Sequence, residues 1–363
     1  MNDQIRPDAY QSLTMKEKTR LPMEDRGPQN IRIHTPMESL RVYQKEPIDP
    51  LSWAYMKLLR EQSRTRRLFK ENPFVEIYQL RENLFGILSV SADGAGDVWS
   101  YLDVGQDRVL LVDTGFGVGN LMAVVRELAG GRPCTVVNTH GHMDHAYGNA
   151  QFEKVYCHEY EADALSKQHS GMWNYLFDEK YPDRGIWMEL SREDLIPFRP
   201  YTVLACPDGF VFSLGKDHEV ELIHLGGHTP GHAAYLDRKN GWLFCGDDLV
   251  SMRVGVGGPR PGAPHPECAT IPFLMKRMEI LAGRIGEISA VFPGHFVTDL
   301  EPSAIPVMAE ACREICRDPV AAATRIRKFP AENLTRFYRE VEGLGCISYT
   351  ENSFYPNGFT VPS

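Results

Sequence analysis

Metal-ligand residue types occur in short clusters directly after short strand-like runs, and this pattern constrains the fold more than any other feature of the chain. The densest cluster, Thr139 to His145, reads Thr-His-Gly-His-Met-Asp-His and follows Thr135-Val136-Val137. Apolar runs of that length bounded by glycine or proline are typical of buried strands. Residues in loops just beyond buried strand ends can converge on one edge of a sheet. We therefore expect one metal site fed by several loops. The other clusters are Asp113-Thr114-Gly115, Gly227 to His232, Gly246-Asp247 and Pro293-Gly294-His295.

The bulk composition excludes several classes of protein. A formal net charge of -9 over 363 residues argues against a nucleic-acid partner, which would need a basic face. No stretch approaches eighteen consecutive apolar residues, so no membrane span is expected. Residues 1–7 lack the apolar core of a secretory signal. The eight cysteines have no framework spacing, which is typical of reduced thiols in a cytoplasmic protein.

Residues 1–72 are expected to form an extension rather than part of the core, because prolines interrupt them and apolar periodicity is poor before Trp53. A helix is predicted from Trp53 to Phe69, with a basic end that suits the negative end of the helix dipole. The simplest interpretation of this basic end is a solvated helix terminus. The alternative is an arm that packs on a neighbouring subunit, as in a homo-oligomer, or that covers the rim of the active site.

Residues 73–300 have the pattern of a catalytic domain. Asn120 can cap a helix that runs to about Leu128 and links two buried apolar runs, which predicts a right-handed βαβ unit. The second half repeats this rhythm, with a helix that starts near Phe273. Two such halves predict two facing sheets with helices outside. Residues 301–363 are expected to form a helical segment and a tail that pack on this domain.

The spacing within the densest cluster indicates two metal ions. His140 and His142 are two residues apart, and Asp144 and His145 follow at once. In a tight turn after a strand, alternate side chains point one way and the intervening pair can point another, so one segment can offer two ligands to each of two ions. Imidazole nitrogen and carboxylate oxygen suit zinc, and also iron or manganese.

These four residues, together with His228, Asp247 and His295, resemble the ligand set of the metallo-β-lactamase-fold hydrolases, in the branch of glyoxalase II and the lactonases. The resemblance covers roughly residues 75–300. It implies a four-layer αββα sandwich of two mixed sheets, with helices on the outside and the metals at one sheet edge. It also implies the ligand roles: His140, His142 and His228 would hold the first metal, Asp144, His145 and His295 would hold the second, and Asp247 would bridge them.

Polar neighbours of these ligands are expected to support them. Asp113 is expected to orient a histidine ligand through a hydrogen bond, with a capping role in its own turn as the alternative. His232 is expected to have a structural role beside the ligands, because the first histidine of its motif is the family's ligand. The Gly-Asp pattern places the bridge on Asp247 rather than Asp248. The histidines expected at the surface or in packing are His158, His169, His218, His224 and His265.

Charge accounting predicts the type of reaction. Two divalent ions bring four positive charges, Asp144 and Asp247 remove two, and a bridging hydroxide removes one. The remaining positive charge suits the oxyanion of a tetrahedral transition state. The metals would lower the pKa of bound water to roughly 7, so no protein nucleophile is needed. We expect attack on an activated carbonyl, and Asp144 could also carry a proton to the departing atom.

The ligand set also selects among branches of the family. The bridging carboxylate Asp247 is unusual for true β-lactamases, and His142 stands where the diiron branch carries a glutamate. The expected protein is therefore a dinuclear metal-dependent hydrolase that acts on a small-molecule carboxylic ester, lactone or thioester. A phosphodiesterase is the first alternative. An iron-dependent oxidoreductase of the persulfide-dioxygenase type is the alternative from another class.

Two irregular segments are the candidates for the substrate pocket. Residues 169–202 are rich in aromatic side chains, which either line the mouth for an apolar or ring-containing group or pack the extension. Residues 251–266 could present an arginine to an anionic group, and a solvated loop is the simpler interpretation. The residues named for substrate binding are Trp173, Tyr175, Tyr181, Trp187, Arg253 and Arg260.

Overall fold

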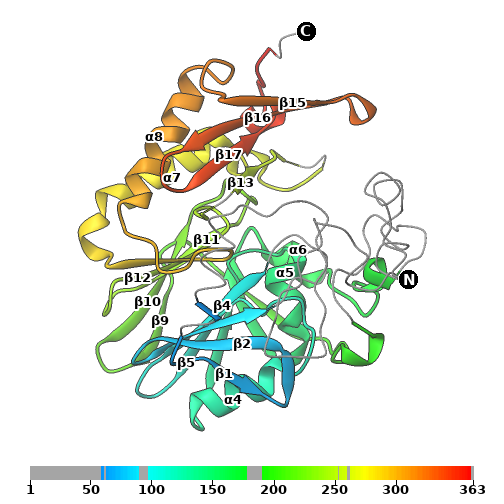
Figure 1. Ribbon diagram of the computed structural model, residues 1–363, viewed down its shortest axis with the longest axis vertical. Coiled ribbons are helices and arrows are strands. Elements are labelled where there is room, and N and C mark those ends of the chain that lie inside the picture. The colour runs from blue at the N-terminus through cyan, green and yellow to red at the C-terminus, as the bar shows by residue number, and fades with distance from the viewer. Residues whose placement is uncertain are drawn as a thin grey trace, which may run out of the picture.

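The computed structural model contains two mixed sheets of eight and five strands and a third sheet of four (Figure 1). It describes residues 59–60, 63–89, 97–177, 190–251, 253–259 and 262–360. The largest sheet runs in chain order, antiparallel from β1 to β5 and parallel from β5 to β8. Its strands are β1 (Arg67–Phe69), β2 (Asn72–Arg81), β3 (Leu84–Ser89), β4 (Val98–Val104), β5 (Val109–Val112), β6 (Cys134–Val137), β7 (Lys154–His158) and β8 (Thr202–Cys206).

Helix α4 (Leu121–Ala129) makes the crossover between the parallel strands β5 and β6, as the sequence predicts. The Asn120 side chain caps it by accepting a hydrogen bond from the backbone N–H of Ala123 at 3.0 Å. Gly130 ends it with a positive φ of 59°, a conformation that glycine adopts without strain. Two short helices, α5 (Met143–Ala146) and α6 (Ala162–Ser166), follow β6 and β7.

The second sheet has the order β14-β12-β11-β10-β9. Its strands β12 and β14 are parallel, and helix α7 (Ile271–Gly283) lies between them in the chain. This helix begins two residues before the predicted Phe273, because Thr270 is its cap and accepts a hydrogen bond from the N–H of Phe273. The strands are β9 (Val211–Gly215), β10 (His218–His224), β11 (Ala233–Asp237), β12 (Trp242–Gly246) and β14 (Ala290–Pro293).

The two larger sheets pack face to face over an aromatic core. Tyr101 of the first sheet contacts Phe244 and Phe292 of the second, with ring centroids 5.4 Å apart in each pair. The outer face of the first sheet shares a buried cluster with α4. The outer face of the second shares another with α7 and with α8 (Ala304–Arg317). The predicted αββα sandwich is therefore confirmed.

The third sheet lies beyond this sandwich, at one end of the molecule (Figure 1). The prediction of a helical segment and tail after residue 300 is wrong for its second half, because three strands follow α8 and, among the described residues 301–360, α8 is the only α-helix. Alternate residues of these strands, such as Phe337 and Ile347, are buried against the α7 and α8 cluster, and this period of two is typical of strands. The sheet order is β13 (Arg253–Val256), β17 (Gly345–Tyr349), β16 (Leu334–Val341) and β15 (Arg325–Phe329).

The N-terminal prediction needs a second correction. The predicted extension comprises residues 1–72, of which residues 1–58, 61 and 62 lie outside the described part of the chain. Residues 59–60 are helical, but Arg67–Phe69 form strand β1, which pairs with β2 and ends the predicted helix early. The reason is tertiary: Phe69 packs against the apolar cluster on the outer face of the first sheet. Among the described residues, no helix is long and apolar enough to cross a membrane.

Candidate metal centre

The predicted ligand clusters meet at one edge of the sandwich. Each one follows the C-terminal end of a strand: His140 follows β6, His228 follows β10, Asp247 follows β12 and His295 follows β14. His140 and His142 lie before α5, while Asp144 and His145 lie in its single turn. The backbone therefore changes from extended at His142 to helical at Asp144 and His145.

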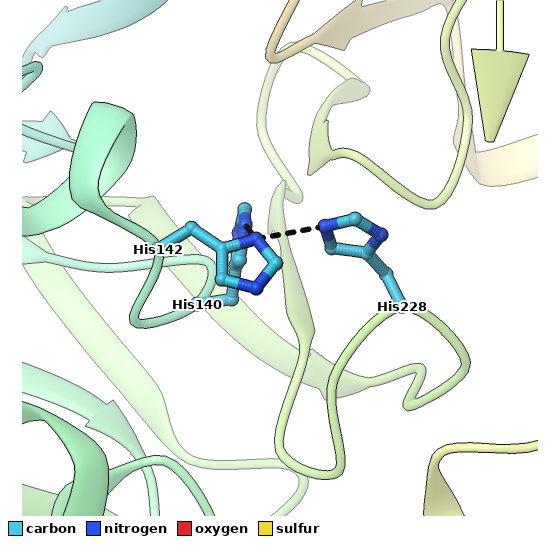
Figure 2. A group of neighbouring side chains, drawn as sticks. All are labelled: His140, His142 and His228. Atoms are coloured by element: carbon cyan, nitrogen blue, oxygen red, sulfur yellow. Dashed lines mark hydrogen bonds between the residues drawn. The ribbon is translucent and has the colours of Figure 1, made fainter. Parts of the chain in front are cut away.

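Three histidine rings form the first group of candidate ligands (Figure 2). The Nδ1 atom of His142 lies 3.0 Å from Nε2 of His140 and 3.0 Å from Nε2 of His228. Ligands of a tetrahedral metal at about 2.0–2.1 Å stand a little over 3 Å apart. These two nitrogen–nitrogen distances are close to the spacing within one coordination shell, and all three ligand atoms lie within 4.8 Å of one another.

Asp144, His145 and His295 form the second group. The Nε2 atom of His295 lies 3.1 Å from Oδ2 of Asp144 and 3.2 Å from Nε2 of His145. The Nε2 atom of His145 is 3.7 Å from the same carboxylate oxygen. All three side chains are buried, so water cannot fully solvate the carboxylate.

Asp247 lies between the two groups. Its Oδ1 atom is 3.2 Å from Nε2 of His145 and 3.6 Å from Nε2 of His295. Its Oδ2 atom is 3.5 Å from Nε2 of His228 and 4.0 Å from Nε2 of His140. Oδ1 is buried and has no hydrogen-bond partner. A buried carboxylate oxygen without a donor, set between two imidazole rings, fits a shared metal ligand.

The hydrogen bonds on the far side of the rings fix which nitrogen carries the proton. A neutral imidazole has one donor and one acceptor nitrogen, so an Nδ1 that donates outward leaves an Nε2 lone pair directed into the centre. Several such lone pairs, next to two carboxylates, repel one another unless a cation lies among them. The donors are His228 Nδ1 to the carbonyl of Gly255 (2.7 Å), His295 Nδ1 to the carbonyl of Asp97 (3.0 Å) and His145 Nδ1 to Oδ2 of Asp113 (2.9 Å).

The electrostatics of the protein alone agree with a cation site. Burial and the neighbouring imidazoles hold the pKa of His140 well below its usual value, and burial lowers the pKa of His142 to about 3. Burial acts to raise the pKa of Asp247, but His295 and His145 outweigh it and hold this pKa well below the usual range. Burial acts to lower the pKa of His145, but the carboxylates of Asp247, Asp144 and Asp113 outweigh it and raise this pKa well above its usual value. The centre thus keeps ionised carboxylates that attract positive charge.

Asp113 has the supporting position predicted for it. Besides its contact with His145, it accepts hydrogen bonds from the N–H of Thr139 at 2.8 Å and from the Thr139 hydroxyl at 2.7 Å. Its backbone has a φ of 62°, the left-handed region that non-glycine residues seldom adopt. The aspartate therefore orients His145 and also positions the backbone next to His140.

His232 and Asp248 support the centre from behind. The N–H of Asp247 donates to Nε2 of His232 at 3.0 Å, and Nδ1 of His232 lies 2.8 Å from Oδ2 of Asp248. Asp248 also accepts a hydrogen bond from the N–H of His228 at 3.0 Å. Asp248 is thus directed away from the candidate ligands, which agrees with Asp247 as the bridging residue.

Glu161 was missed at the sequence level. Its buried carboxylate accepts hydrogen bonds from the N–H of Gly141 at 2.9 Å and of Gly231 at 3.1 Å, and from the hydroxyl of Thr229. It therefore ties the His140–His142 loop to the loop of His228. A lone glutamate two residues after Glu159 carries no motif, so its position in the fold alone identifies it.

The residues named for substrate binding separate into groups. Trp173 is only 4% exposed, and its indole N–H donates to the carbonyl of Phe116 at 2.7 Å, so it packs the core and does not line a pocket. The Tyr175 hydroxyl lies 2.7 Å from the sulfur of Met143, next to Asp144. Arg253 is exposed on β13. Tyr181, Trp187 and Arg260 lie outside the described residues.

A separate group of candidate ligand types lies between the two larger sheets. Nε2 of His218 is 3.2 Å from Oδ2 of Asp103 and 3.2 Å from Oδ2 of Asp237. Burial raises the pKa of Asp103 to about 6, and the two carboxylates outweigh burial and raise the pKa of His218 to about 9. The predicted packing role of His218 thus takes the form of an ionic contact between sheets.

Comparison with known proteins agrees with this architecture. The family model described as "Metallo-beta-lactamase superfamily" matches residues 93–295. The acyl-coenzyme A thioesterase MBLAC2 of Gallus gallus is 31% identical over 204 residues, which are 53% of this chain and 70% of that protein. The hydroxyacylglutathione hydrolase of Maricaulis maris is 29% identical over 123 residues, 32% of this chain and 34% of that protein.

Among solved structures, DIM-1 metallo-beta-lactamase aligns with a TM-score of 0.46 at 19% identity, covering 66% of this chain and 97% of that one. The family match covers more than half of the chain and spans the loops that carry all seven candidate ligands. The chain therefore belongs to the metallo-beta-lactamase superfamily, as one of its hydrolases.

Proposed function

We propose that this protein is a thioesterase with a dinuclear metal centre, and that its substrates are acyl thioesters of coenzyme A. The observation that carries the dinuclear centre is the convergence of imidazole nitrogens on Asp247, whose buried Oδ1 has no hydrogen-bond donor. The choice of substrate is supported by the relatives, since an acyl-coenzyme A thioesterase and a hydroxyacylglutathione hydrolase both take their names from thioesters.

The chain's own residues would divide the work as follows. His140, His142 and His228 would hold one cation and Asp144, His145 and His295 would hold the other, and Asp247 would be a ligand that both share. Two divalent cations bound there, most simply zinc, supply a hydroxide at neutral pH and polarise a carbonyl oxygen. Asp113 and the carbonyl of Gly255 keep their histidines in the tautomer that presents Nε2 to the centre.

We propose that Asp144 also carries a proton to the departing atom. Its Oδ2 lies 3.1 Å from Nε2 of His295, and His295 and His145 outweigh its burial to hold the pKa of Asp144 below the usual range. A thiolate leaves readily without a proton, whereas an alkoxide does not. Proton delivery by Asp144 would therefore matter less for thioesters than for oxygen esters, a difference that kinetics can measure.

The test combines metal analysis with a substrate panel. Purified protein is loaded with zinc, its metal content is measured, and hydrolysis of an acyl-coenzyme A, a lactone, an aryl ester and a phosphodiester is compared. We expect two zinc ions per chain and the highest kcat/KM on the thioester. Hydrolysis of the phosphodiester alone, or a single iron with oxygen consumption, would replace this proposal with one of the alternative functions.

Substitution of the bridging residue tests the centre itself. Asp247→Asn removes the charge between the two cations, so we expect loss of at least one metal and of most turnover. Asp208→Asn is the matched control, because that carboxylate is partly exposed and pairs with Arg277 away from the ligands. Full metal content and full turnover in Asp247→Asn would contradict the bridging role.

A further inference from the structure

One face of the third sheet is rich in arginine. Residues on the other face, such as Val254 and Ile347, are buried against α7 and α8. Side chains alternate between the faces along a strand, and directly paired residues share a face. The registers Arg253↔Cys346↔Glu340, Gly255↔Ser348↔Tyr338↔Arg325 and Arg336↔Arg327 therefore define one surface. We name its four guanidinium groups, Arg253, Arg325, Arg327 and Arg336, the arginine face.

Within the described part of the chain, the four arginines of this face form no ion pair. Ion pairs of the described arginines involve other positions, such as Arg284, Arg313 and Arg339. Arg327 and Arg336 stand directly opposite each other on an antiparallel pair, an arrangement of like charges that destabilises a sheet. The Nε atom of Arg336 is buried and has no hydrogen-bond partner. An anion bound between these guanidinium groups would offset both costs.

The geometry of the face favours a planar or multivalent anion. The guanidinium of Arg325 lies 4.3 Å from the ring centroid of Tyr338, its directly paired neighbour, and this cation–π contact keeps it at the sheet. Guanidinium groups bind phosphate through paired hydrogen bonds, so several neighbouring arginines select a phosphate-rich ligand. Glu340 is the acidic residue on this face, at the position opposite Cys346. The whole chain has a formal net charge of -9, so four arginines on one face are a local concentration of positive charge on an acidic protein.

The arginine face is continuous with the candidate metal centre. The carbonyl of Gly255 on β13 accepts the hydrogen bond of 2.7 Å from Nδ1 of His228. A Cβ atom on Gly255 would point to the same face and meet the His228 ring at 3.8 Å, and Oγ of Ser348 at 3.8 Å. From β13, strand β15 lies three strand spacings away, roughly 14 Å. A long substrate could therefore reach from the metal centre across the sheet to Arg325 and Arg327.

We propose that the arginine face binds the phosphate groups of the nucleotide part of a coenzyme A thioester while its acyl carbonyl lies at the metal centre. This inference rests on the proposed thioesterase function and adds to it the residues that select coenzyme A. The pantetheine arm is long and flexible enough to connect the two. Arg325, Arg327 and Arg336 follow residues 93–295, which match the family, whereas Arg253 lies within them, so most of this determinant lies outside the family match.

The test compares two thioesters that carry the same acyl group. One is the acyl-coenzyme A, and the other is the S-acyl-N-acetylcysteamine, which has the thioester but no phosphate. The variant is Arg325→Gln/Arg327→Gln/Arg336→Gln, with Arg327→Glu as a single substitution in case the triple variant folds poorly. The control is Arg126→Gln/Lys154→Gln/Lys216→Gln, which removes the same charge from exposed positions on α4, the start of β7 and the β9–β10 turn.

We expect KM for the acyl-coenzyme A to rise about tenfold or more in the arginine variants, since each lost charge-assisted contact weakens binding. The kcat/KM of these variants for the N-acetylcysteamine thioester should stay within about twofold of the value for the unmodified protein. In the control variant, the kcat/KM for both thioesters should stay within the same range. Added salt should raise KM for the acyl-coenzyme A alone. Equal KM values for the acyl-coenzyme A in the arginine variants and the unmodified protein would overturn the inference and leave the thioesterase proposal intact.

Direct binding separates the two proposals. Calorimetry with adenosine 3′,5′-bisphosphate, the nucleotide end of coenzyme A, needs no catalysis. If neither thioester is hydrolysed, the proposed function fails. The arginine face is still supported if the unmodified protein binds adenosine 3′,5′-bisphosphate and Arg327→Glu does not. Absence of nucleotide binding to the unmodified protein, or equal binding by Arg327→Glu, would refute it.

Discussion

Oδ2 of Asp113 lies 2.9 Å from Nδ1 of His145, and the same oxygen accepts the Thr139 hydroxyl hydrogen bond at 2.7 Å. One carboxylate thus holds a candidate ligand of the second metal and, through Thr139, the ring of His140, whose Nδ1 lies 3.1 Å from the Thr139 hydroxyl oxygen. Both metal groups depend on this buried aspartate, although it offers neither of them a ligand.

Asp113→Asn should weaken metal binding without removing a ligand. The amide can offer its NH₂ group to Nδ1 of His145, which favours the tautomer with the proton on Nε2, where the metal should bind. Loss of such a supporting partner lowers metal affinity by about 10- to 100-fold. Competition with a chromogenic chelator measures the affinity, with Asp163→Asn, on the exposed pair with Lys167, as the control. An unchanged affinity in Asp113→Asn would show that the contact does not set the tautomer.

Gly294→Ala should disturb the second metal group by crowding. A Cβ atom at this position would lie 2.7 Å from Oδ1 of Asp247 and 2.7 Å from Cε1 of His145, which is closer than van der Waals contact permits. The buried side chains have to move, so we expect weaker binding of one metal and a loss of turnover. Gly283→Ala is the control, because nothing lies within 4 Å of the added atom there. Metal titration of both variants decides whether the close packing at Gly294 is needed.

The candidate ligands were predictable from the sequence because they are local. His140 to His145 form a continuous motif, and His228, Asp247 and His295 each follow a short apolar run at a strand end. The helix α4 was predictable for the same reason, since its cap and its terminating glycine adjoin it in the chain.

Other features depend on contacts that no local pattern reveals. Strand β13 pairs with β17, where Val254 lies opposite Ile347, and such distant pairing does not show in sequence periodicity. Trp173 lies in an aromatic-rich segment that could line a pocket, yet its indole N–H donates a hydrogen bond to the carbonyl of Phe116 in the core. Glu161 carries no motif at all and is recognised only by the two loops that it joins.

Glu76→Ala should destabilise the protein strongly. Glu76 is fully buried and accepts hydrogen bonds of 3.0 Å from Nε of Arg60 and of 2.5 Å from the hydroxyl of Tyr78. Removing Glu76 takes away the closer of the two carboxylates that pair with this buried guanidinium and leaves Asp97, 3.3 Å from its Nη2, so we expect a loss of about 3 kcal/mol. Urea unfolding of Glu76→Ala measures the loss, with Glu219→Ala, on the exposed pair with Arg238, as the control. A loss below about 1 kcal/mol, the value of an exposed pair, would mean that Arg60 is solvated.

The contact of His218 with Asp103 and Asp237 should make stability fall as the pH rises. The pKa of His218 in the folded protein is about 9, raised by the two carboxylates against the effect of burial, whereas its usual value is 6.5. A raised folded pKa means that the protonated imidazole stabilises the fold fully below about pH 6.5 and that this contribution is lost as the pH passes 9. The raised pKa of Asp103, about 6, acts in the same direction at lower pH. The free energy of unfolding should therefore fall by up to about 3 kcal/mol across the His218 interval.

Asp103→Asn separates this effect from other titrations. It removes one of the two carboxylates that contact Nε2 of His218, so the pKa of His218 should move back toward its usual value, and the fall in stability should begin at a lower pH and be smaller. Urea unfolding at a series of pH values measures the stability, and the NMR shift of the His218 ring measures its pKa directly. Identical pH profiles for Asp103→Asn and the unmodified protein would mean that the contact between the sheets does not titrate as an ionic one.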